Sequence, residues 1–389
     1  SGQDTQCSGR DQIPGLKDQN EWKSNYELYT ELLGAGVPTA SLQDINLNRQ
    51  ALHIPYNDPF FEGVKGLQGA FKWNSGDDGT KDWYPQGVTV PHVLLGDSDL
   101  ASNDYIAVSW YSKETPNKGV RISIVDPTTL KYRHVLLVVM YEDNSPPTGA
   151  DSAPNYMEVP VHAGGIALVG DLLHVADTWN GIRTFNMSMM MEVQTSQDVL
   201  GLQKDGLYYA YQYRYIIPQV NTYLNVTGVD PRYSFVSASL DYESGDGLLT
   251  LGEYESPETD GRIFQYNLDI TTGKLQVNKK GLVTTPSDCC YTPGEDRMQG
   301  AYYDYSSEEL ALSCSSQVGS IGALYVSEPN ELNGPYKQDV WVYGCEDLTK
   351  GRACCGFPQD EVEGMYTLTE HLNNRTVFSV DPLFYFGRT

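Results

Sequence analysis

The sequence has few basic residues and no long apolar run. Lys and Arg number 26 against 51 Asp and Glu, which gives a formal net charge of −25. Such a charge repels phosphate backbones and anionic lipid surfaces, and no Lys/Arg run offsets it. No apolar run reaches the roughly 18 residues that a membrane-spanning helix needs. We therefore expect that the protein binds neither nucleic acid nor membranes.

Histidine and cysteine do not have the number and spacing of a zinc site. The chain has 6 His and 7 Cys, two pairs of the cysteines being adjacent. Disulfide bonds in an oxidising compartment are the better interpretation, with the pairing left open and the odd cysteine unassigned. The polar first residues indicate a signal peptide already removed. We predict a secreted, extracellular glycoprotein, with N-glycans at three triplets of the glycosylation type: Asn186, Asn225 and Asn374.

Residues typical of strands and turns are abundant. The chain has 28 Tyr, 37 Gly and 21 Pro, and tyrosine suits a half-buried pleated surface whereas Gly and Pro supply turns. One unit recurs, beginning with "PQGVTV", "HAGGIAL", "YSFVSASLDY", "MQGAYYDY" and "VEGMYTLTEH". About three further β-like runs follow most of these starts. The reference positions are 76, 75, 62 and 64 residues apart: Gln86, His162, Ser237, Gln299 and Glu363.

Four-stranded units repeated around a circle are typical of a β-propeller. We predict an all-β fold, a β-propeller with five four-stranded antiparallel blades. Six blades are an alternative because "LQGAFKWNSG" (67–76) resembles a blade start, and a pair of β-sandwiches is another. Residues 1–50 should form an extension with a short helix, and residues 51–389 one propeller closed by N- and C-terminal strands. Residues 142–160 should form a loop over the mouth of the channel.

The Gly-led starts suggest where a site would lie. Where first strands meet near the axis, backbone approaches backbone and glycine fits because it has no Cβ. The residue before each glycine then faces the channel mouth, which gives a convergent polar set: Gln86, His162, Gln299 and Glu363. A ring of this kind can also do no more than hold ordered water or one central ion.

Two chemistries suit these residues. A glycosidase needs two carboxylates about 5 to 10 Å apart, for which Glu363 and Asp296 are candidates. A polysaccharide lyase needs a base such as His162 and a cation such as Arg297. We therefore predict His162, Glu363 and Asp296 as catalytic residues. Aromatic rings stack on sugars, so the predicted substrate-binding set combines rings with polar groups: Gln86, Gln299, Trp83, Tyr84, Trp179, Arg297, Tyr291 and Tyr366.

Three segments carry a family resemblance: "VPVHAGGIALVGDLLHVADTWNGIRTF", "KGVRISIVDPTTLKYRHVLLV" and "WYPQGVTV". Together they resemble secreted β-propeller proteins of fungi and filamentous actinobacteria, over roughly residue 65 to the C-terminus. The resemblance implies secretion and fold rather than a particular reaction. The second-blade core is also similar to repeats of lactonase-like and NHL-type propellers. Five-bladed arabinanases and invertases are the functional comparison, although their acidic signatures near the first strand are absent.

These observations lead to a ranked set of functions. The first is an extracellular enzyme that cleaves a polysaccharide, by hydrolysis or by elimination, at the mouth of the channel. The second is a propeller that binds carbohydrate without catalysis. The third is a calcium-dependent lactonase-like hydrolase with an ion in the central channel. The sequence identifies no other cofactor, and the metal ligands stay unassigned.

Overall fold

The computed structural model describes residues 13–97, 104–228, 230–258, 260–315, 321–329, 337–352 and 363–387. Regular structure in these ranges is mostly β, which agrees with the all-β part of the predicted fold class. The α-helices there are α1 (Trp22–Gly34) and α2 (Ser75–Gly79), and short 3-10 turns occupy Pro59–Phe61, Met187–Met189 and Pro382–Phe384. No helix in the described ranges is long and apolar enough to cross a membrane.

The largest sheet combines two four-stranded antiparallel groups. The first comprises β5 (Trp83–Thr89), β6 (Ile106–Ser112), β7 (Val120–Val125) and β8 (Lys131–Asp143). The second comprises β10 (Ile166–Val169), β11 (Leu172–Asp177), β12 (Gly181–Asn186) and β16 (Tyr215–Asn225). The outer strands β8 and β16 pair in parallel, Leu136 opposite Ile216. The repeat pattern predicts two separate blades here. The pairing of β8 with β16 instead joins the two groups into one continuous sheet.

Three further antiparallel groups form separate sheets. The third comprises β17 (Tyr233–Asp241), β18 (Asp246–Glu253), β19 (Ile263–Asn267) and β20 (Cys290–Tyr291). The fourth comprises β21 (Met298–Asp304), β22 (Glu309–Cys314), β23 (Gly322–Ser327) and β24 (Lys337–Trp341). The fifth comprises β25 (Cys345–Arg352), β26 (Glu363–Thr369), β27 (Thr376–Val380), β4 (Leu67–Lys72) and β3 (Leu52–His53). Strand β4, the start of the alternative sixth blade, is thus an outer strand of the fifth group.

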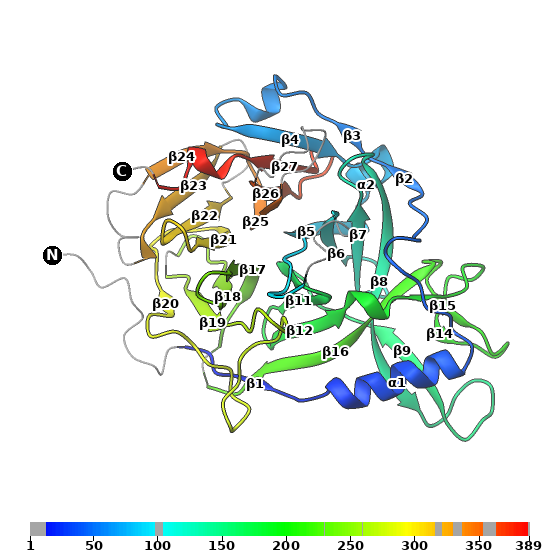
Figure 1. The fold of residues 1–389 in the computed structure, drawn as a ribbon. Coiled ribbons are helices and arrows are strands. Elements are labelled where there is room, and N and C mark those ends of the chain that lie inside the picture. The colour runs from blue at the N-terminus through cyan, green and yellow to red at the C-terminus, as the bar shows by residue number, and fades with distance from the viewer. Residues whose placement is uncertain are drawn as a thin grey trace.

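Short strands extend the joined sheet at its outer side. Strands β1 (Leu16–Asp18) and β13 (Met191–Glu192) pair with β16, whereas β2 (Arg49–Gln50) and β9 (Ala153–Glu158) pair with β8. Strands β14 (Leu200–Leu202) and β15 (Tyr208–Ala210) form a separate hairpin. Because β9 pairs with the end of β8, residues 142–160 form a hairpin at the outer edge (Figure 1). The prediction of a loop over the channel mouth is therefore wrong.

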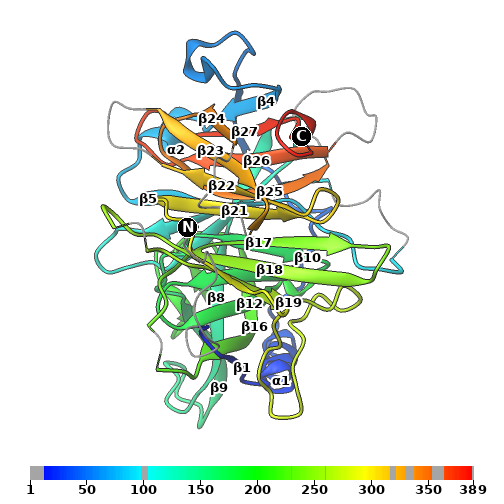
Figure 2. The same ribbon diagram turned by 90° about the vertical axis from the view of Figure 1, so that its left-hand side faces the viewer.

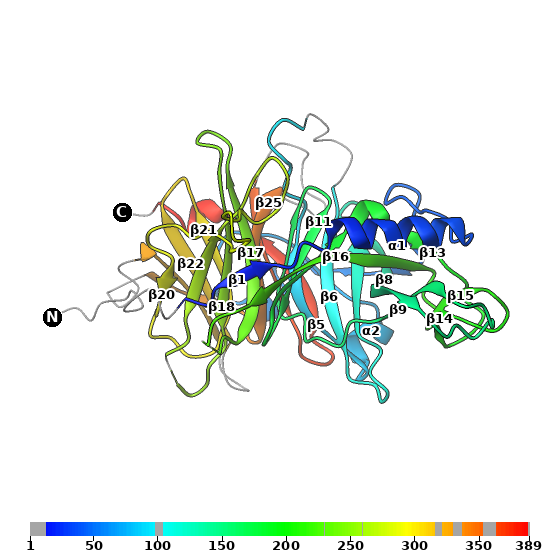
Figure 3. The same cartoon turned by 90° about the horizontal axis from the view of Figure 1, so that it is seen from below.

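The sheets surround a common centre with their first strands innermost (Figure 1). In the side view, β17 and β18 lie beside β21 and β22 of the next sheet (Figure 2). Helix α1 follows the outside of the joined sheet near β16 (Figure 3). Its buried Asn25 side chain donates a hydrogen bond of 3.1 Å to the carbonyl of Val220, which fixes the helix against that strand.

Apolar side chains fill the space between successive groups. Separate buried clusters lie between the first and second, second and third, third and fourth, and fourth and fifth groups. A further cluster joins the fifth group to the first, with Phe71 and Tyr366 packed in the same core as Val88 and Trp110. The five groups therefore bury their faces against one another all the way round, and no group relies on a single neighbour.

The first strand of the fifth group is not the one that the repeat predicts. Glu363 begins β26, the second strand, whereas the innermost strand is β25. Strand β25 reads "CEDLTKGR", which has too few apolar residues to show the alternation of a buried strand. The pattern therefore selects β26 and assigns its first residue to the wrong end of the sheet.

Candidate functional site

The side chain of Asp347 on β25 contacts the first strands of three other groups near the axis. Its Oδ2 accepts the backbone N–H of Val88 on β5 at 3.2 Å and of Ile166 on β10 at 3.0 Å. The backbone N–H groups of Val236 on β17 and of Leu348 lie close enough to this carboxyl to lower its pKa. Asp347 is fully buried, and burial raises its pKa despite these donors. The first strands run in the same direction, since contacts between neighbours advance in step, as from Ser237 with Ala301 to Ser239 with Tyr303, and their N-terminal ends share one end of the axis.

Close backbone contacts explain the glycines before β10. A Cβ on Gly164 would lie 2.2 Å from the carbonyl oxygen of Ser234, and one on Gly165 would lie 2.2 Å from the backbone nitrogen of Val236. The predicted reason for the Gly-led start is therefore correct here. Ala163 has a φ of +52°, a left-handed conformation that is unfavourable for alanine. This turn places His162 at the N-terminal end of the first strands.

A hydrogen-bonded chain joins His162, Gln86 and Glu370. The Gln86 Nε2 group donates to Glu370 Oε2 at 2.5 Å and to the carbonyl of Pro85 at 2.9 Å. Its Oε1 therefore faces His162 Nε2, 2.8 Å away. Because an amide oxygen only accepts, the neutral imidazole must carry its proton on Nε2. The Nδ1 lone pair is then left as the basic position of the ring.

His162 is neutral at physiological pH and open to solvent. Its side chain is exposed, although protein atoms surround it closely enough that burial lowers its pKa to about 4. The nearby cations Lys113 and Arg232 contribute to this lowering of the pKa because both disfavour an imidazolium. An exposed imidazole that stays unprotonated is suited to accept a proton from a bound molecule.

Tyr111 forms one wall beside His162. The two ring centroids are 4.1 Å apart, and Tyr84 lies behind Tyr111 at 5.9 Å. Burial and the nearby carboxyl of Glu370 raise the pKa of Tyr111, so that its hydroxyl keeps its proton. The Lys113 ammonium lies 3.8 Å from the centroid of Tyr84. The site thus combines a neutral base, a protonated phenol and a cation.

Glu346 is a second carboxyl close to Glu370. Its side chain is 2% exposed, and its Oε2 has no hydrogen-bond partner among the described residues. Burial, followed by repulsion from Glu370 and Asp347, raises the pKa of Glu346 well above its usual range. Glu346 therefore holds a proton under conditions in which an exposed glutamate does not. Sequence reasoning missed both glutamates, and only the position of Glu370 after the "EGMYTLT" run could have indicated it.

Glu363 does not lie with His162. It pairs in register with Arg352 at the far end of β25, whereas Thr369, just before Glu370, pairs with Cys345 at the near end. Seven residues of strand separate Glu363 from Glu370, or about 23 Å at 3.3 Å per residue. The Glu363 carboxylate instead forms an ion pair of 2.8 Å with Lys350. The expected pairing of Glu363 with His162 in one pocket is therefore wrong.

The remaining predicted polar residues lie near the start of β21. Asp296 and Arg297 form an ion pair of 2.6 Å with each other. Gln299 is half-buried on β21, within the irregular pairing between Met298 and Gly300. This is the same end of the first strands as His162, but no contact joins these three residues to it among the described residues. Their predicted roles stay predictions.

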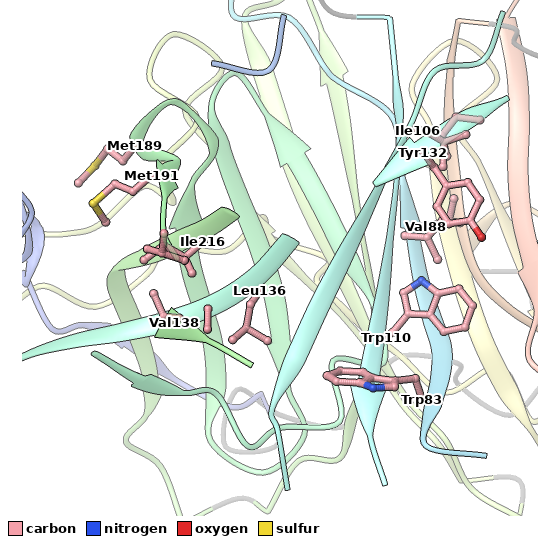
Figure 4. Close-up of a cluster of buried hydrophobic side chains, with 14 of the residues drawn as sticks. Trp83, Val88, Ile106, Trp110, Tyr132, Leu136, Val138, Met189, Met191 and Ile216 are labelled. Carbon is pink, nitrogen blue, oxygen red and sulfur yellow. The ribbon is translucent and has the colours of Figure 1, made fainter. Parts of the chain in front are cut away.

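Several predicted aromatic residues are part of the core. Trp83, Tyr291 and Tyr366 are at most 6% exposed, and Figure 4 shows Trp83 among buried side chains with Trp110. A ring without an accessible face cannot stack on a sugar, so the structure does not support these three as binding residues. Tyr84 is half-buried beside Tyr111. Trp179, in the turn between β11 and β12, is 63% exposed and is the predicted ring that remains available.

The described cysteines divide into bonded and free groups. Cys290 is disulfide-bonded, and Cys314 and Cys345 are buried free thiols. Cys7, Cys354 and Cys355 lie outside the described residues. In the described ranges no group of three or more His, Cys, Asp or Glu side chains could hold a metal ion. The calcium ion of the third functional alternative stays a prediction.

Comparisons with known proteins give no family. No family model matches the chain, and no curated protein matches it. Among solved structures, a GH43_1 enzyme of Xanthomonas citri, complexed with xylotriose, has 9% identity and a TM-score of 0.35, covering 79% of this chain and 89% of that chain. An exo-β-1,3-galactanase of Phanerochaete chrysosporium, with galactose, has 10% identity and a TM-score of 0.30, covering 74% and 63%. The polysaccharide lyase Uly1 has 8% identity and a TM-score of 0.26, covering 81% and 99%. Similarity at this level carries no functional argument.

Proposed function

We propose that this protein is a secreted carbohydrate-active enzyme that cleaves a polysaccharide at the end of the axis where Gln86, Tyr111, His162 and Glu370 meet. We also propose that the fold is a five-bladed β-propeller whose first and second blades are joined by the pairing of β8 with β16. In this proposal each antiparallel group is one blade, and the five apolar clusters are the interfaces between neighbouring blades. Strand β4 closes the ring by pairing with β27 from the other end of the chain.

The observation that supports catalysis is the state of His162. Gln86 fixes the proton on Nε2, and Nδ1 forms no hydrogen bond with any described residue. The ring is exposed and has a pKa of about 4, so it is a free base at neutral pH. A histidine that only stabilises a fold is normally enclosed and bonded at both nitrogens, as His174 is with Thr184 and Gly273. His162 is instead built to accept a proton.

Elimination is the reaction that fits this geometry. His162 takes a proton from a sugar carbon through Nδ1, and Tyr111 donates its hydroxyl proton to the departing glycosidic oxygen. Glu370 stabilises the imidazolium that forms, acting through the amide of Gln86. Hydrolysis is the second candidate because Glu346 holds a proton beside Glu370, which is how a carboxyl pair divides acid and base roles. The buried position of Glu346 makes hydrolysis the weaker proposal.

A polysaccharide panel tests the proposal. The purified protein is incubated with neutral and acidic polymers, and both new reducing ends and the ultraviolet absorbance of unsaturated sugars are recorded. Substitution His162→Ala should lower kcat/KM about 10²- to 10⁴-fold, the usual contribution of a general base. His53→Ala serves as the matched control because His53 is exposed on β3.

Two results contradict the proposal. If His162→Ala cleaves a responsive polymer as fast as the wild type, His162 is not the base. If sugars bind but no polymer in the panel is cleaved, the protein is a carbohydrate-binding propeller. Reducing ends without unsaturated products would favour hydrolysis and the Glu346–Glu370 pair.

A further inference from the structure

The end of the axis that contains His162 has an unusual charge. The chain has 26 Lys and Arg against 51 Asp and Glu, yet the charged groups that act most strongly on His162 are Lys113 and Arg232. Lys113 follows β6 of the first group, and Arg232 immediately precedes β17 of the third. Two cations from separate groups therefore flank one exposed imidazole in a strongly acidic protein.

Lys113 has no acidic partner in the part of the chain that the structure describes. Its side chain is exposed, and its Nζ forms no ion pair with any described carboxylate. It lies instead over the rings of Tyr84 and Tyr111, at 3.8 and 5.4 Å from their centroids. Lys118 in the same connection shows the contrast, since its Nζ is 3.4 Å from Glu114 and 3.2 Å from Asp198. The ring faces therefore orient Lys113 while its charge stays available.

Arg232 is only partly used by the protein. One Nη1 group donates to the carbonyl of Tyr254 at 3.0 Å, and the carboxylate of Glu255 is 4.0 Å away. Its other guanidinium N–H groups form no hydrogen bond with the described residues, and its side chain is 40% exposed. The close approach of Gly164 to Ser234 brings the segment of Arg232 beside that of His162. A planar N–H edge is thus left for an anion.

We propose that the substrate is an acidic polysaccharide made of uronate sugars, and that Lys113 and Arg232 hold the uronate carboxylate while His162 removes the neighbouring proton. This inference rests on the proposed function and specifies its substrate. A neutral polysaccharide would leave Lys113 without a charged partner and the free N–H groups of Arg232 without an acceptor. A uronate supplies both cations with a carboxylate, on the carbon next to the reacting C5–H bond.

The reaction balances without any further reactant. His162 Nδ1 takes the C5 proton, the electron pair of that bond forms the C4=C5 double bond, and the bond from C4 to the glycosidic oxygen breaks. The oxygen takes the Tyr111 proton, and the His162 proton later returns to Tyr111 through solvent. Negative charge builds on the carboxylate as the C5 proton leaves, so Lys113 and Arg232 bind the transition state more strongly than the substrate.

The test compares charged and uncharged forms of the same polymers. Polygalacturonate, alginate and hyaluronan are assayed beside their carboxyl-reduced forms by unsaturated-product absorbance and reducing ends. We expect cleavage of at least one acidic polymer and none of its reduced form. Lys113→Gln and Arg232→Gln should each lower kcat/KM about 10- to 100-fold, the effect of losing a hydrogen bond to a charged group. Lys113→Arg should keep most activity, and the control Lys118→Gln should keep all of it.

A second measurement needs no substrate. Lys113→Gln removes the Lys113 charge and should raise the pKa of His162, whereas Lys118→Gln should leave that pKa unchanged. The pKa is measured by NMR of the imidazole protons. Equal cleavage of a carboxyl-reduced polymer, or full activity of both Gln variants, would overturn the uronate inference. If such cleavage still required His162, the proposed function would stand without it. If His162→Ala were fully active, the proposed function itself would fail.

Discussion

Gln86 offers the sharpest test of how the site works. Gln86→Met keeps the length of the side chain and removes its hydrogen bonds to His162 Nε2 at 2.8 Å, to Glu370 Oε2 at 2.5 Å and to the carbonyl of Pro85 at 2.9 Å. While His162 is neutral, the first bond joins neutral groups and is worth about 1 kcal/mol. When His162 gains a proton, the same bond has a charged donor and is worth about 1.5 to 3 kcal/mol.

The difference determines the kinetic signature. Because the bond strengthens only as the proton moves, its loss should lower kcat about 10-fold and leave KM almost unchanged. The wild-type kcat/KM should also fall as pH drops through about 4, since the base is active only when unprotonated and its pKa is about 4. Both quantities are measured as pH–rate profiles on a responsive polymer.

A matched variant separates orientation from stability. Gln68, on β4, is also buried and donates through Nε2, to the carbonyl of Glu363 at 3.0 Å, but it lies at the other end of the first strands. Gln68→Met should therefore lower the melting temperature without changing kcat or the pH profile. Our reasoning would be refuted if Gln86→Met changed KM alone, or if both variants lowered kcat equally.

Two further predictions concern stability. His174 is fully buried, and burial lowers its pKa from 6.5 to about 4, so the unfolded chain binds a proton at this residue first as pH falls. Between pH 7 and 4 the wild type should therefore lose up to about 3 kcal/mol of unfolding free energy relative to His174→Gln, from 2.5 pKa units at 1.36 kcal/mol each. A difference between the two proteins that stays constant with pH in urea unfolding would contradict this. Gly165→Ala places a Cβ 2.2 Å from the backbone nitrogen of Val236 and should lower the free energy of unfolding, measured thermally, by about 1 to 3 kcal/mol. The control Gly34→Ala, at the end of α1, places its Cβ where nothing lies within 4 Å and should be neutral or stabilising. Equal effects of the two variants would mean that the close contact at Gly165 is relieved at no cost.

Much of the fold follows from local pattern. The strands at 106–112, 120–125 and 131–143 are alternating or continuous apolar runs bounded by turn residues, and such runs are recognised without any tertiary information. Helix α1 lies where the helix-like spacing predicts it. The joining of β8 to β16 could not be predicted, because parallel pairing of two outer strands leaves no short-range signal. Strand β25 could not be found either, since its polar residues are buried by neighbouring strands, among them β5, β17 and β21, rather than by an apolar face.

Part of the site could be predicted from local sequence pattern, whereas the rest depends on tertiary packing. Gln86 and His162 precede glycines whose close contacts can be argued from the repeat alone. Lys113, Arg232 and Glu370 lie in connections, and which connection approaches His162 depends on the packing between groups. The net charge of the whole chain gave no guidance, because it does not show which charged groups lie near His162.

The error at Glu363 shows what a repeat can and cannot locate. A glycine-led start marks a strand that is crowded near the centre, but crowding occurs at both ends of that strand. Strand β26 is antiparallel to β25, so its first residue lies at the far end and the residue after its last lies beside Gln86. The carboxylate that is hydrogen-bonded to His162 through Gln86 therefore lies at the end of "EGMYTLTE", at Glu370. In any ring of antiparallel groups, the direction of the strand decides which polar residues can meet.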